Sequence, residues 1–552
     1  MCRGLAPSLS SAGPAASLLG RAARGFGGSV GPTTEIAYSI ATMRRLFIPV
    51  ALLCISCGDS TTNVSDGATA STGVATTDAP TDVSVGETSA APTDTGDETT
   101  TDATTDATTD ATTDAPATAT TSTTTTSTAT TDDTTGPAPL GCDEVVLADP
   151  ALEQEIRGEL GIPDGPIDPA AAATLTELLI GDRIDSFAGL ECFTGLTEIN
   201  LVNEQPSMLS DLTPLAGLTQ LELLYLAEGQ VSDLTPLAGL TKLRALRVAF
   251  NPIESLEPVA GLPLTYLIAS GIPADTFPAV GDMLLLESLT FEDAGVADIA
   301  PLAGLTALQD LFLDGNAIVD LGPLAGLTQL ERLWFRENAV VDLAALAGLK
   351  ALTFVRADGN AIDSLAPLAD LPVLRLLYAP DNAIVDVTPL AGLPKLEHID
   401  LSNNAVVDPS PLVTTPVLET LELDGNPLAD NLDGLADHPA LIQIDVTNTG
   451  LTTIPAVATA TLRNLLAADN TIVDLTPLDV YTKLEWVDLR DNAVTSIAPI
   501  VDDPWAIACA KVTLHGNPLD AQTLDTLIPM LCEDDLYLEW GVDEACPSCF
   551  MP

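Results

Sequence analysis

Apolar and polar positions alternate in short runs that return every 22 residues through the middle of the chain. The segment 330–351 reads LERLWFRENAVVDLAALAGLKA. Its Leu330, Leu333 and Phe335 share one side of an extended segment, while Arg332 and Trp334 point to the other. The preceding segment, LQDLFLDGNAIVDLGPLAGLTQ, has the same order. The pattern predicts one short strand per repeat, with one buried and one exposed face.

An asparagine follows each predicted strand in the same frame. The six regular positions are Asn316, Asn338, Asn360, Asn382, Asn404 and Asn426. An amide side chain both donates and accepts hydrogen bonds, so it can satisfy backbone groups that a buried turn leaves unpaired. We therefore expect a structural ladder of stacked asparagines.

The second half of each repeat reads approximately DLxPLAGLT and returns the chain along the outer side. Proline and glycine there permit only a short helical turn or extended coil. One unit cannot bury its own leucines, whereas stacked neighbours can. Residues 196–519 are therefore predicted to form one solenoid of about 14 or 15 coils.

Two features interrupt this regularity before the middle block. The sequence EQPSM at 204–208 reads as an insertion. The segment 264–283 lacks both the asparagine and PLAGL, which suggests a kink or a local widening of the arc.

The 552-residue length would accommodate several ordinary domains, but the repeats favour one long solenoid. The net charge is -58. Nucleic acids and anionic lipids demand basic surfaces, so neither is an expected direct partner.

The N-terminal region predicts export. Residues 1–42 lack periodicity and are interpreted as a non-native upstream extension, with Met43 as the start. Residues 43–56 combine two arginines with a short apolar run, as in a signal peptide. The small residue before Cys57 resembles the lipobox of bacterial lipoproteins, which implies lipidation of Cys57, although Cys54 stands where leucine is usual. An ordinary cleaved signal, or a start at Met1 without export, remains open.

Residues 57–140 are dominated by Thr, Asp, Ala and Ser, with TTDATTDATTDATTDA at their centre. Such a segment has almost nothing apolar to bury, so we expect a disordered, self-repelling linker. It would suit a tether that lifts a domain away from a membrane.

Both ends of the solenoid are predicted to carry caps. In the N-terminal cap and first atypical repeat, 141–195, the pairs Asp149-Pro150 and Asp168-Pro169 are helix-start signals. In the C-terminal cap, 520–552, a helix from about Ala521 would cover the last leucines.

Cysteines cluster at these two ends and are absent between them, which suggests disulfides formed in an oxidising compartment. Cys142 with Cys192 is the preferred N-terminal pair. Pairing at the C-terminal end stays open, with Cys509 to Cys532 as the first choice. The candidates are Cys142, Cys192, Cys509, Cys532, Cys546 and Cys549.

The pattern L-x-x-L-x-L-x-x-N, with DLTPLAGLTQL at 211–221, resembles the 22-residue repeats of internalin-like bacterial leucine-rich repeat proteins. The resemblance covers about residues 142–530. It implies an α/β fold, a leucine-rich-repeat horseshoe with a parallel β-sheet on the concave face and short 3₁₀ turns on the convex face. With the cysteines above, its caps would be disulfide-stapled. Such proteins mostly bind other proteins through the concave face.

Catalytic chemistry has little support. The three histidines, His398, His438 and His515, share no local motif with a nucleophile, and no phosphate loop or HExxH occurs. His398 falls at an outward strand position and is expected to be exposed. The CPSC segment lacks the context of a redox or zinc motif. We predict a non-enzyme without cofactor or metal.

Binding is better supported, because scarce aromatic residues and arginines converge on the outward strand positions of adjacent repeats. Tyr, Trp and Arg dominate binding hot spots, although strands favour aromatic residues in any case. The predicted concave patch comprises Phe312, Arg332, Trp334, Arg336, Phe354, Arg356, Tyr378 and His398.

The sequence thus predicts a lipid-anchored, exported protein of the bacterial cell envelope that recognises a protein or peptide. A carbohydrate-binding or structural envelope scaffold, and an intracellular scaffold, are the alternatives.

Overall fold

The computed structural model describes residues 142, 144–202, 206–226, 228–501, 510–533, 536–541 and 544–546. All belong to one compact unit spanning 136–552. The expected extension, signal, linker and lipidation residue Cys57 lie outside the described residues. So do Cys509, Cys549 and the beginning of the expected insertion at 204–208.

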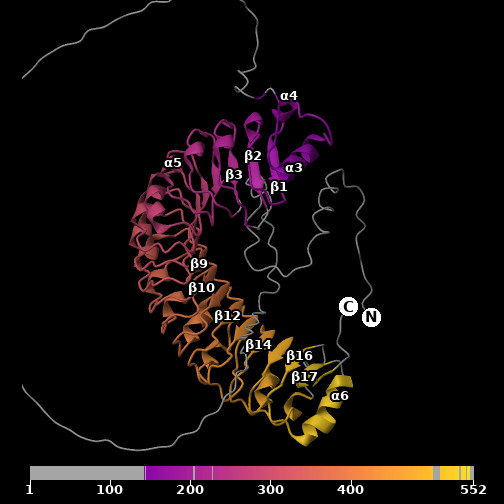
Figure 1. The fold of residues 1–552 in the computed structure, drawn as a ribbon. Helices are drawn as coiled ribbons and strands as arrows, with labels where there is room; N and C mark the ends of the chain where they lie inside the picture. Colours follow the sequence, from indigo (N-terminus) through magenta and orange to yellow (C-terminus); the bar gives the residue numbers. More distant parts are fainter. Residues whose placement is uncertain are drawn as a thin grey trace, which may run out of the picture. The chain divides into compact units, whose positions relative to one another are not determined.

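Short strands stack side by side into one sheet along the inner side of an arc (Figure 1). Each strand from β1 to β16 pairs in parallel with the next, and β18 pairs antiparallel with β17. The bounds are β1 Glu177–Ile180, β2 Glu198–Leu201, β3 Leu223–Tyr225, β4 Ala245–Arg247, β5 Tyr266–Ile268, β6 Ser288–Thr290, β7 Asp310–Phe312, β8 Arg332–Trp334, β9 Phe354–Arg356, β10 Leu376–Tyr378, β11 His398–Asp400, β12 Thr420–Glu422, β13 Gln443–Asp445, β14 Asn464–Leu466, β15 Trp486–Asp488, β16 Lys511–Thr513, β17 Tyr537–Gly541 and β18 Glu544–Ala545. The fifteen strands β2–β16 lie within 196–519, in agreement with the expected number of coils.

The alternation within each repeat has the predicted structural result. Leu330, Leu333 and Phe335 are each 0% exposed, whereas Arg332 is exposed and Trp334 is half-buried. The same pattern in successive coils produces one continuous core of leucine side chains. Stacking therefore supplies the burial that a single coil lacks.

The return segments form the expected short turns on the outer side of the arc (Figure 1). Most are 3₁₀ turns with proline near their start and a buried leucine inside. They are η2 Leu190–Cys192, η3 Thr213–Leu215, η4 Thr235–Leu237, η5 Ala274–Asp282, η6 Ala300–Gly304, η7 Gly322–Gly326, η8 Ala344–Gly348, η9 Ala366–Leu368, η10 Thr388–Leu390, η11 Ser410–Thr414, η12 Asp433–Leu435, η13 Thr476–Val480 and η14 Ala498–Ile500, together with the α-helical turn α5 Glu257–Ala260.

An aspartate precedes many of these turns and caps them. Asp320 Oδ1 accepts a hydrogen bond from the N–H of Gly322 at 2.7 Å, and Asp386 Oδ1 accepts one from Thr388 at 2.8 Å. The carboxylate satisfies a backbone donor that the turn leaves free. Part of the large negative charge is therefore structural.

The asparagines form the predicted ladder. Asn382 is typical: its Oδ1 accepts from the N–H of Ile362 in the preceding coil at 3.0 Å. Its Nδ2 donates to the carbonyls of Ala357, Ala379 and Pro380 at 3.0, 3.2 and 3.0 Å. Each asparagine thus ties its own turn to the neighbouring coil.

The N-terminal cap follows its sequence signals. Asp149 caps α3 (Pro150–Leu160), and Asp168 caps α4 (Pro169–Ala172). Leu152 and Ile156 of α3 are both 0% exposed against the first coil. The Cys142–Cys192 disulfide, spanning 50 residues, is present as expected.

The C-terminal cap contains the expected helix, a π-helical turn η15 (Thr523–Leu527) that continues into α6 (Ile528–Glu533). Cys532 is bonded to Cys546 of the segment after β18. The first-choice pairing of Cys509 with Cys532 is therefore wrong, because the chain returns through β17 and brings Cys546 beside α6.

The irregular segment 264–283 does not interrupt the sheet. β5 remains in register with β4 and β6. A nine-residue 3₁₀ segment, η5, replaces the usual turn. Its Phe277 is 1% exposed and meets the ring of Phe291 edge-on, with centroids 4.8 Å apart. A large aromatic side chain fills the space that the missing leucine motif would occupy.

Candidate binding surface on the concave sheet

Strand register places the outward residues of successive coils in continuous rows. The residue at the end of each strand occupies the middle row: Phe312 pairs with Trp334, Trp334 with Arg356, and Arg356 with Tyr378. The first row contains Arg332, which pairs with Phe354. The structure therefore brings the predicted patch residues onto adjacent coils of one face.

The aromatic side chains form a connected series, the aromatic ladder, defined as Phe312, Trp334, Phe354, Tyr378 and His398. Successive ring centroids lie 4.8, 5.5, 5.4 and 4.7 Å apart. These separations fall within the range of favourable ring–ring contact. The ladder steps between the middle and first rows. Its end members Phe312 and His398 are buried, whereas Trp334, Phe354 and Tyr378 between them are half-buried on the concave face.

His398 differs from its expectation. It occupies an outward strand position, yet it is only 6% exposed. The ring of Tyr378 stacks on it, and Glu422 Oε1 lies 3.9 Å from its Nε2. Burial lowers the pKa of His398 to about 4, so the imidazole is neutral near pH 7. Neither ring nitrogen has a hydrogen-bond partner among the described residues.

The arginines of the patch are held by carboxylates. Arg332 pairs with Asp310 of the preceding coil. Arg336 Nε lies 3.4 Å from Asp314, and Arg356 Nε lies 3.1 Å from Asp358. These pairs orient the guanidinium groups and cancel much of their charge.

Arg356 also makes a contact with the aromatic ladder. Its guanidinium carbon lies 5.6 Å from the ring centroid of Trp334, within range of a cation–π interaction. The indole Nε1 of Trp334 is buried and lacks a hydrogen-bond partner among the described residues.

Beyond Tyr378 the middle row changes from aromatic to acidic. Asp400, Glu422 and Asp445 are consecutive register partners in β11, β12 and β13. All three are half-buried; we refer to them as the carboxylate column. Burial, with repulsion from neighbouring acids, raises the pKa of Glu422 to about 8 and that of Asp445 to about 6. The pKa of Asp400 is also raised, mainly by burial.

The sequence reasoning did not single out this column. Asp400 and Glu422 fall in the middle row by the 22-residue period, but Asp445 follows Glu422 by 23 residues. That extra residue shifts the frame. Extending the row by strand order instead of by a fixed count would have found Asp445.

The fold has relatives among solved structures, although no known family profile and no curated protein matches the chain. A leucine-rich repeat protein of Leptospira interrogans matches with a TM-score of 0.53 and 18% identity, over 67% of this chain and 91% of that one. The ectodomain of the receptor kinase GASSHO1/SCHENGEN3 of Arabidopsis thaliana matches with a TM-score of 0.52 and 20% identity, over 66% and 47%. The fold is that of a leucine-rich repeat protein. An internalin of Listeria monocytogenes gives a TM-score of 0.49 and 23% identity, over 66% of this chain and 97% of that one.

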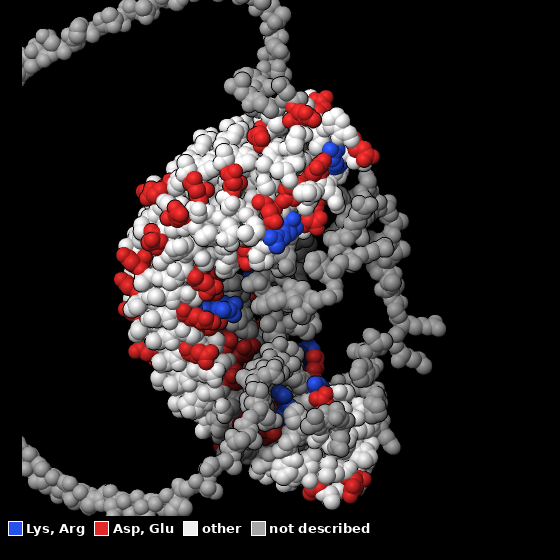
Figure 2. Space-filling view, in the orientation of Figure 1, with Lys and Arg blue, Asp and Glu red and all other residues white. Residues whose placement is uncertain are grey.

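Charge is unevenly distributed over this leucine-rich repeat protein. Figure 2 shows acidic side chains spread across the visible side of the arc, with the few basic ones mainly toward its inner side. Most charged side chains on this visible side are therefore acidic.

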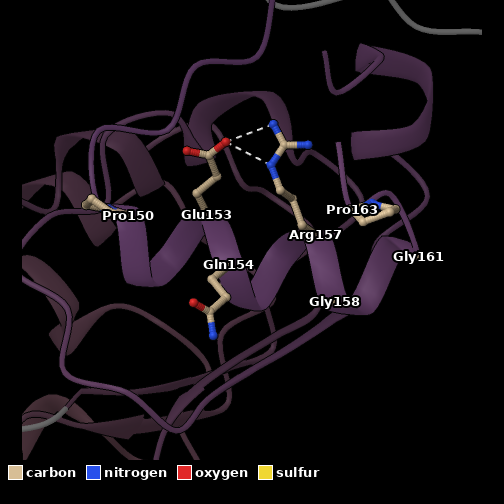
Figure 3. Close-up of a pocket in the computed structure, with 7 residues that line it drawn as sticks. All are labelled: Pro150, Glu153, Gln154, Arg157, Gly158, Gly161 and Pro163. Atoms are coloured by element: carbon tan, nitrogen blue, oxygen red, sulfur yellow. Dashed lines mark hydrogen bonds and ion pairs between the residues drawn. The ribbon is translucent and has the colours of Figure 1, made fainter. Parts of the chain in front are cut away.

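A hollow of about 570 Å³ is lined by residues of α3 and of the segment that follows it. Figure 3 shows Glu153 and Arg157 joined across one helical turn beside it. Because the arginine is engaged by Glu153 and by the carbonyl of Ile162, the hollow offers no free charge or nucleophile.

Within the described part of the chain, no group of three or more His, Cys, Asp or Glu side chains is arranged to hold a metal ion. Among the same residues, no helix is long and apolar enough to cross a bilayer. The aromatic ladder and the carboxylate column are therefore the strongest candidates for a functional surface.

Proposed function

We propose that this protein is a non-catalytic binding protein of the bacterial cell envelope and that its concave sheet recognises a protein or peptide partner. The aromatic ladder carries the proposal: four Phe, Trp and Tyr rings lie in contact across adjacent coils, in a chain where these residue types make up only 4%, and the ring of His398 stacks at the end of the series. Such rings supply large contact areas at low entropic cost, and with arginine they dominate binding hot spots.

The fold supports the same function. The Arabidopsis ectodomain was solved in complex with Casparian strip integrity factor 2. A Toll structure with a TM-score of 0.52 and 18% identity, over 66% of this chain and 53% of that one, is a complex with Spatzle. Leucine-rich repeats are typical of protein-binding domains, because stacking coils creates a long concave surface.

Capture from an envelope extract tests the binding function. Replacing Trp334, Arg336 and Arg356 together with alanine should abolish capture of the partner, and Trp334→Ala alone should weaken it strongly. Lys395→Ala, at an exposed position outside the strands, is the control. Unfolding curves of all variants establish that the fold is retained. Undiminished capture by the folded triple variant would exclude the patch as the binding surface.

A glycan array run with the same variants addresses the carbohydrate-binding alternative. Glycan binding that depends on Trp334, without capture of any protein, would favour it over the proposal.

The envelope location rests on the signal-like segment 43–56, on Cys57 and on the acidic linker. The disulfides at both caps support an oxidising compartment. Mass analysis of the mature N-terminus should find a lipid on Cys57, and Cys57→Ser should release the protein from the membrane fraction. A mature chain beginning at Met1 with free thiols would favour the intracellular alternative.

A further inference from the structure

We infer that the segment bound by the concave sheet carries a lysine or arginine that is received by the carboxylate column, beside an apolar residue on the aromatic ladder. This inference rests on the proposed function and specifies the chemistry of the partner. Three observations support it. Among the described residues, the carboxylate column has no basic partner where other charges on the sheet are paired, and the buried ring of His398 faces Glu422 without a hydrogen bond. The aromatic ladder also leads in register into the column.

Elsewhere on the sheet, charged side chains are matched between adjacent coils. Arg332 pairs with Asp310 and Arg463 with Glu485, each 22 residues away. Arg375 Nη2 lies 2.6 Å from Glu397 Oε2 in the same arrangement. Neighbouring strands bring these side chains together, and opposite charges stabilise the contact.

The carboxylate column departs from this arrangement. Among the described residues, no lysine or arginine lies within ion-pair distance of Asp400, Glu422 or Asp445. Asp400 accepts hydrogen bonds from Ser402, and Asp445 accepts one from the N–H of Thr447. Within the described part of the chain, the carboxylate of Glu422 accepts none. When these carboxylates are ionised, like charges on adjacent strands destabilise the sheet, so stability does not account for the column.

His398 provides a second, independent observation. Its side chain is 8% exposed, and its Nε2 faces Glu422 Oε1 across 3.9 Å. Both ring nitrogens lack hydrogen bonds among the described residues. A polar side chain that is buried, unpaired and aimed at the column is costly to stability. Because the imidazole is neutral, it supplies no counter-charge to Glu422, whose side chain remains 30% exposed toward the concave side.

The ladder leads directly into the column. Tyr378 pairs in register with Asp400, and Asp400 with Glu422. Adjacent strands are about 4.8 Å apart, and an extended peptide advances about 3.3 Å per residue. Tyr378 and Glu422 are thus about three peptide residues apart, and Trp334 and Glu422 about six. A basic side chain over the column would place an apolar side chain about three to six residues away on the ladder.

The occupant that fits is an extended peptide segment with this spacing. A lysine ammonium or an arginine guanidinium can donate to several carboxylate oxygens at once. The apolar part of the segment excludes water from the ladder, which strengthens the neighbouring ion pairs.

Selection from a random twelve-residue peptide library, displayed on phage and applied to the full chain, tests the inference. We expect enriched sequences to carry Lys or Arg at about three to six residues from an aromatic or large aliphatic residue. Glu422→Gln and Asp445→Asn are close in shape to the wild type and remove like-charge repulsion, so both variants should fold. The double variant should lose the basic preference and keep the apolar one.

Affinity measurements on one selected peptide quantify the effect. Replacing its basic residue with alanine, or Glu422 with glutamine, should weaken binding by about tenfold, the order expected for losing one partner of a half-buried ion pair. Asp363→Asn removes the same charge at an exposed position outside the strands and should leave the affinity unchanged.

The outcomes separate the two proposals. The inference would be overturned, and the proposed function would stand, if the enriched peptides depend on Trp334 but carry no basic residue. The same conclusion would follow if basic peptides bind the double variant as well as the wild type. Failure to enrich any peptide whose binding depends on Trp334 would overturn both.

Discussion

Replacing Asn404 with alanine tests whether the asparagine ladder stabilises the solenoid. Asn404 is 9% exposed. Its Oδ1 accepts a hydrogen bond from the N–H of Ile384 at 2.9 Å. Its Nδ2 donates to the carbonyls of Ala379, Leu401 and Ser402 at 2.9, 3.0 and 3.2 Å. One side chain therefore joins two coils through four hydrogen bonds.

The cost of Asn404→Ala follows from which backbone groups keep another partner. The carbonyl of Leu401 still accepts a hydrogen bond from the Asn426 side chain, and that of Ser402 accepts one from the backbone N–H of Asp381. The carbonyl of Ala379 still accepts one from the Asn382 side chain. The buried N–H of Ile384 has no other acceptor among the described residues. An orphaned donor costs about 1–3 kcal/mol, and each other lost bond costs about 0.5–1 kcal/mol. We expect a total loss of about 2.5–6 kcal/mol for the four bonds together.

Equilibrium urea unfolding and amide hydrogen exchange measure this loss. The unfolding midpoint of Asn404→Ala should fall clearly, and the Ile384 amide should exchange about a hundredfold faster, because exchange reports local opening in a solenoid. Lys395→Ala changes an exposed side chain nearby and should stay within about 0.5 kcal/mol of the wild type.

Asn404→Asp tests the accepting oxygen of this side chain apart from its donating nitrogen. It keeps an oxygen for Ile384 but places a carboxylate against three carbonyls, so it should be at least as destabilising as alanine at pH 7 and recover in part on acidification. A loss below about 1 kcal/mol for alanine, or a wild-type stability for aspartate at pH 7, would refute this account of the ladder.

Two further predictions concern charge and covalent linkage. Because the pKa of Glu422 is raised from 4.5 to about 8, the folded state binds this proton more tightly than the unfolded chain, and the stability associated with it falls as the pH rises through that interval. Glu422→Gln should therefore leave stability unchanged near pH 4 and raise it by about 2 kcal/mol at pH 9, after allowance for the partial exposure of the side chain. Thermal unfolding at both pH values measures this gain, and a gain that is absent at pH 9 or larger at pH 4 would contradict the argument. The Cys142–Cys192 disulfide joins residues 50 positions apart, so Cys192→Ser should lower the free energy of unfolding by ~4 kcal/mol on the chain-entropy estimate. In hydrogen exchange, the first coils should lose protection before the middle ones. A uniform loss along the solenoid would show that the disulfide does not stabilise the N-terminal coils in particular.

Much of the fold was predictable because one physical rule is repeated. The spacing of Leu330, Leu333 and Phe335 defines a buried face, and the next coil reproduces it. Asp149 and Asp168 were recognisable as helix caps because capping depends on residues close in sequence. These features are local, and the 22-residue period extends them along the chain.

Features that depend on contacts between distant or irregular segments were less predictable. Cys532 pairs with Cys546 because β17 and β18 fold back beside α6, a turn that no periodic pattern encodes. His398 is buried by Tyr378 of the preceding coil and faces Glu422 of the next. Its exposure therefore depends on side chains in neighbouring coils, which strand alternation alone does not describe.

The spacing of the coils also determines the chemistry of the carboxylate column. Asn426 joins the coils of Asp400 and Glu422, because it donates to the carbonyl of Leu401 and accepts from the N–H of Val406. The coils of Glu422 and Asp445 are joined by backbone hydrogen bonds, such as that from the N–H of Leu423 to the carbonyl of Asp445 at 2.9 Å. The three carboxylates therefore cannot separate without breaking hydrogen bonds between coils. Their repulsion can then be relieved by taking up protons or by contact with a cation from outside. The first route produces the predicted pH dependence of stability, and the second the predicted preference for a basic partner. Because both arise from the same three side chains, Glu422→Gln should raise stability at high pH and weaken binding of a basic peptide at the same time.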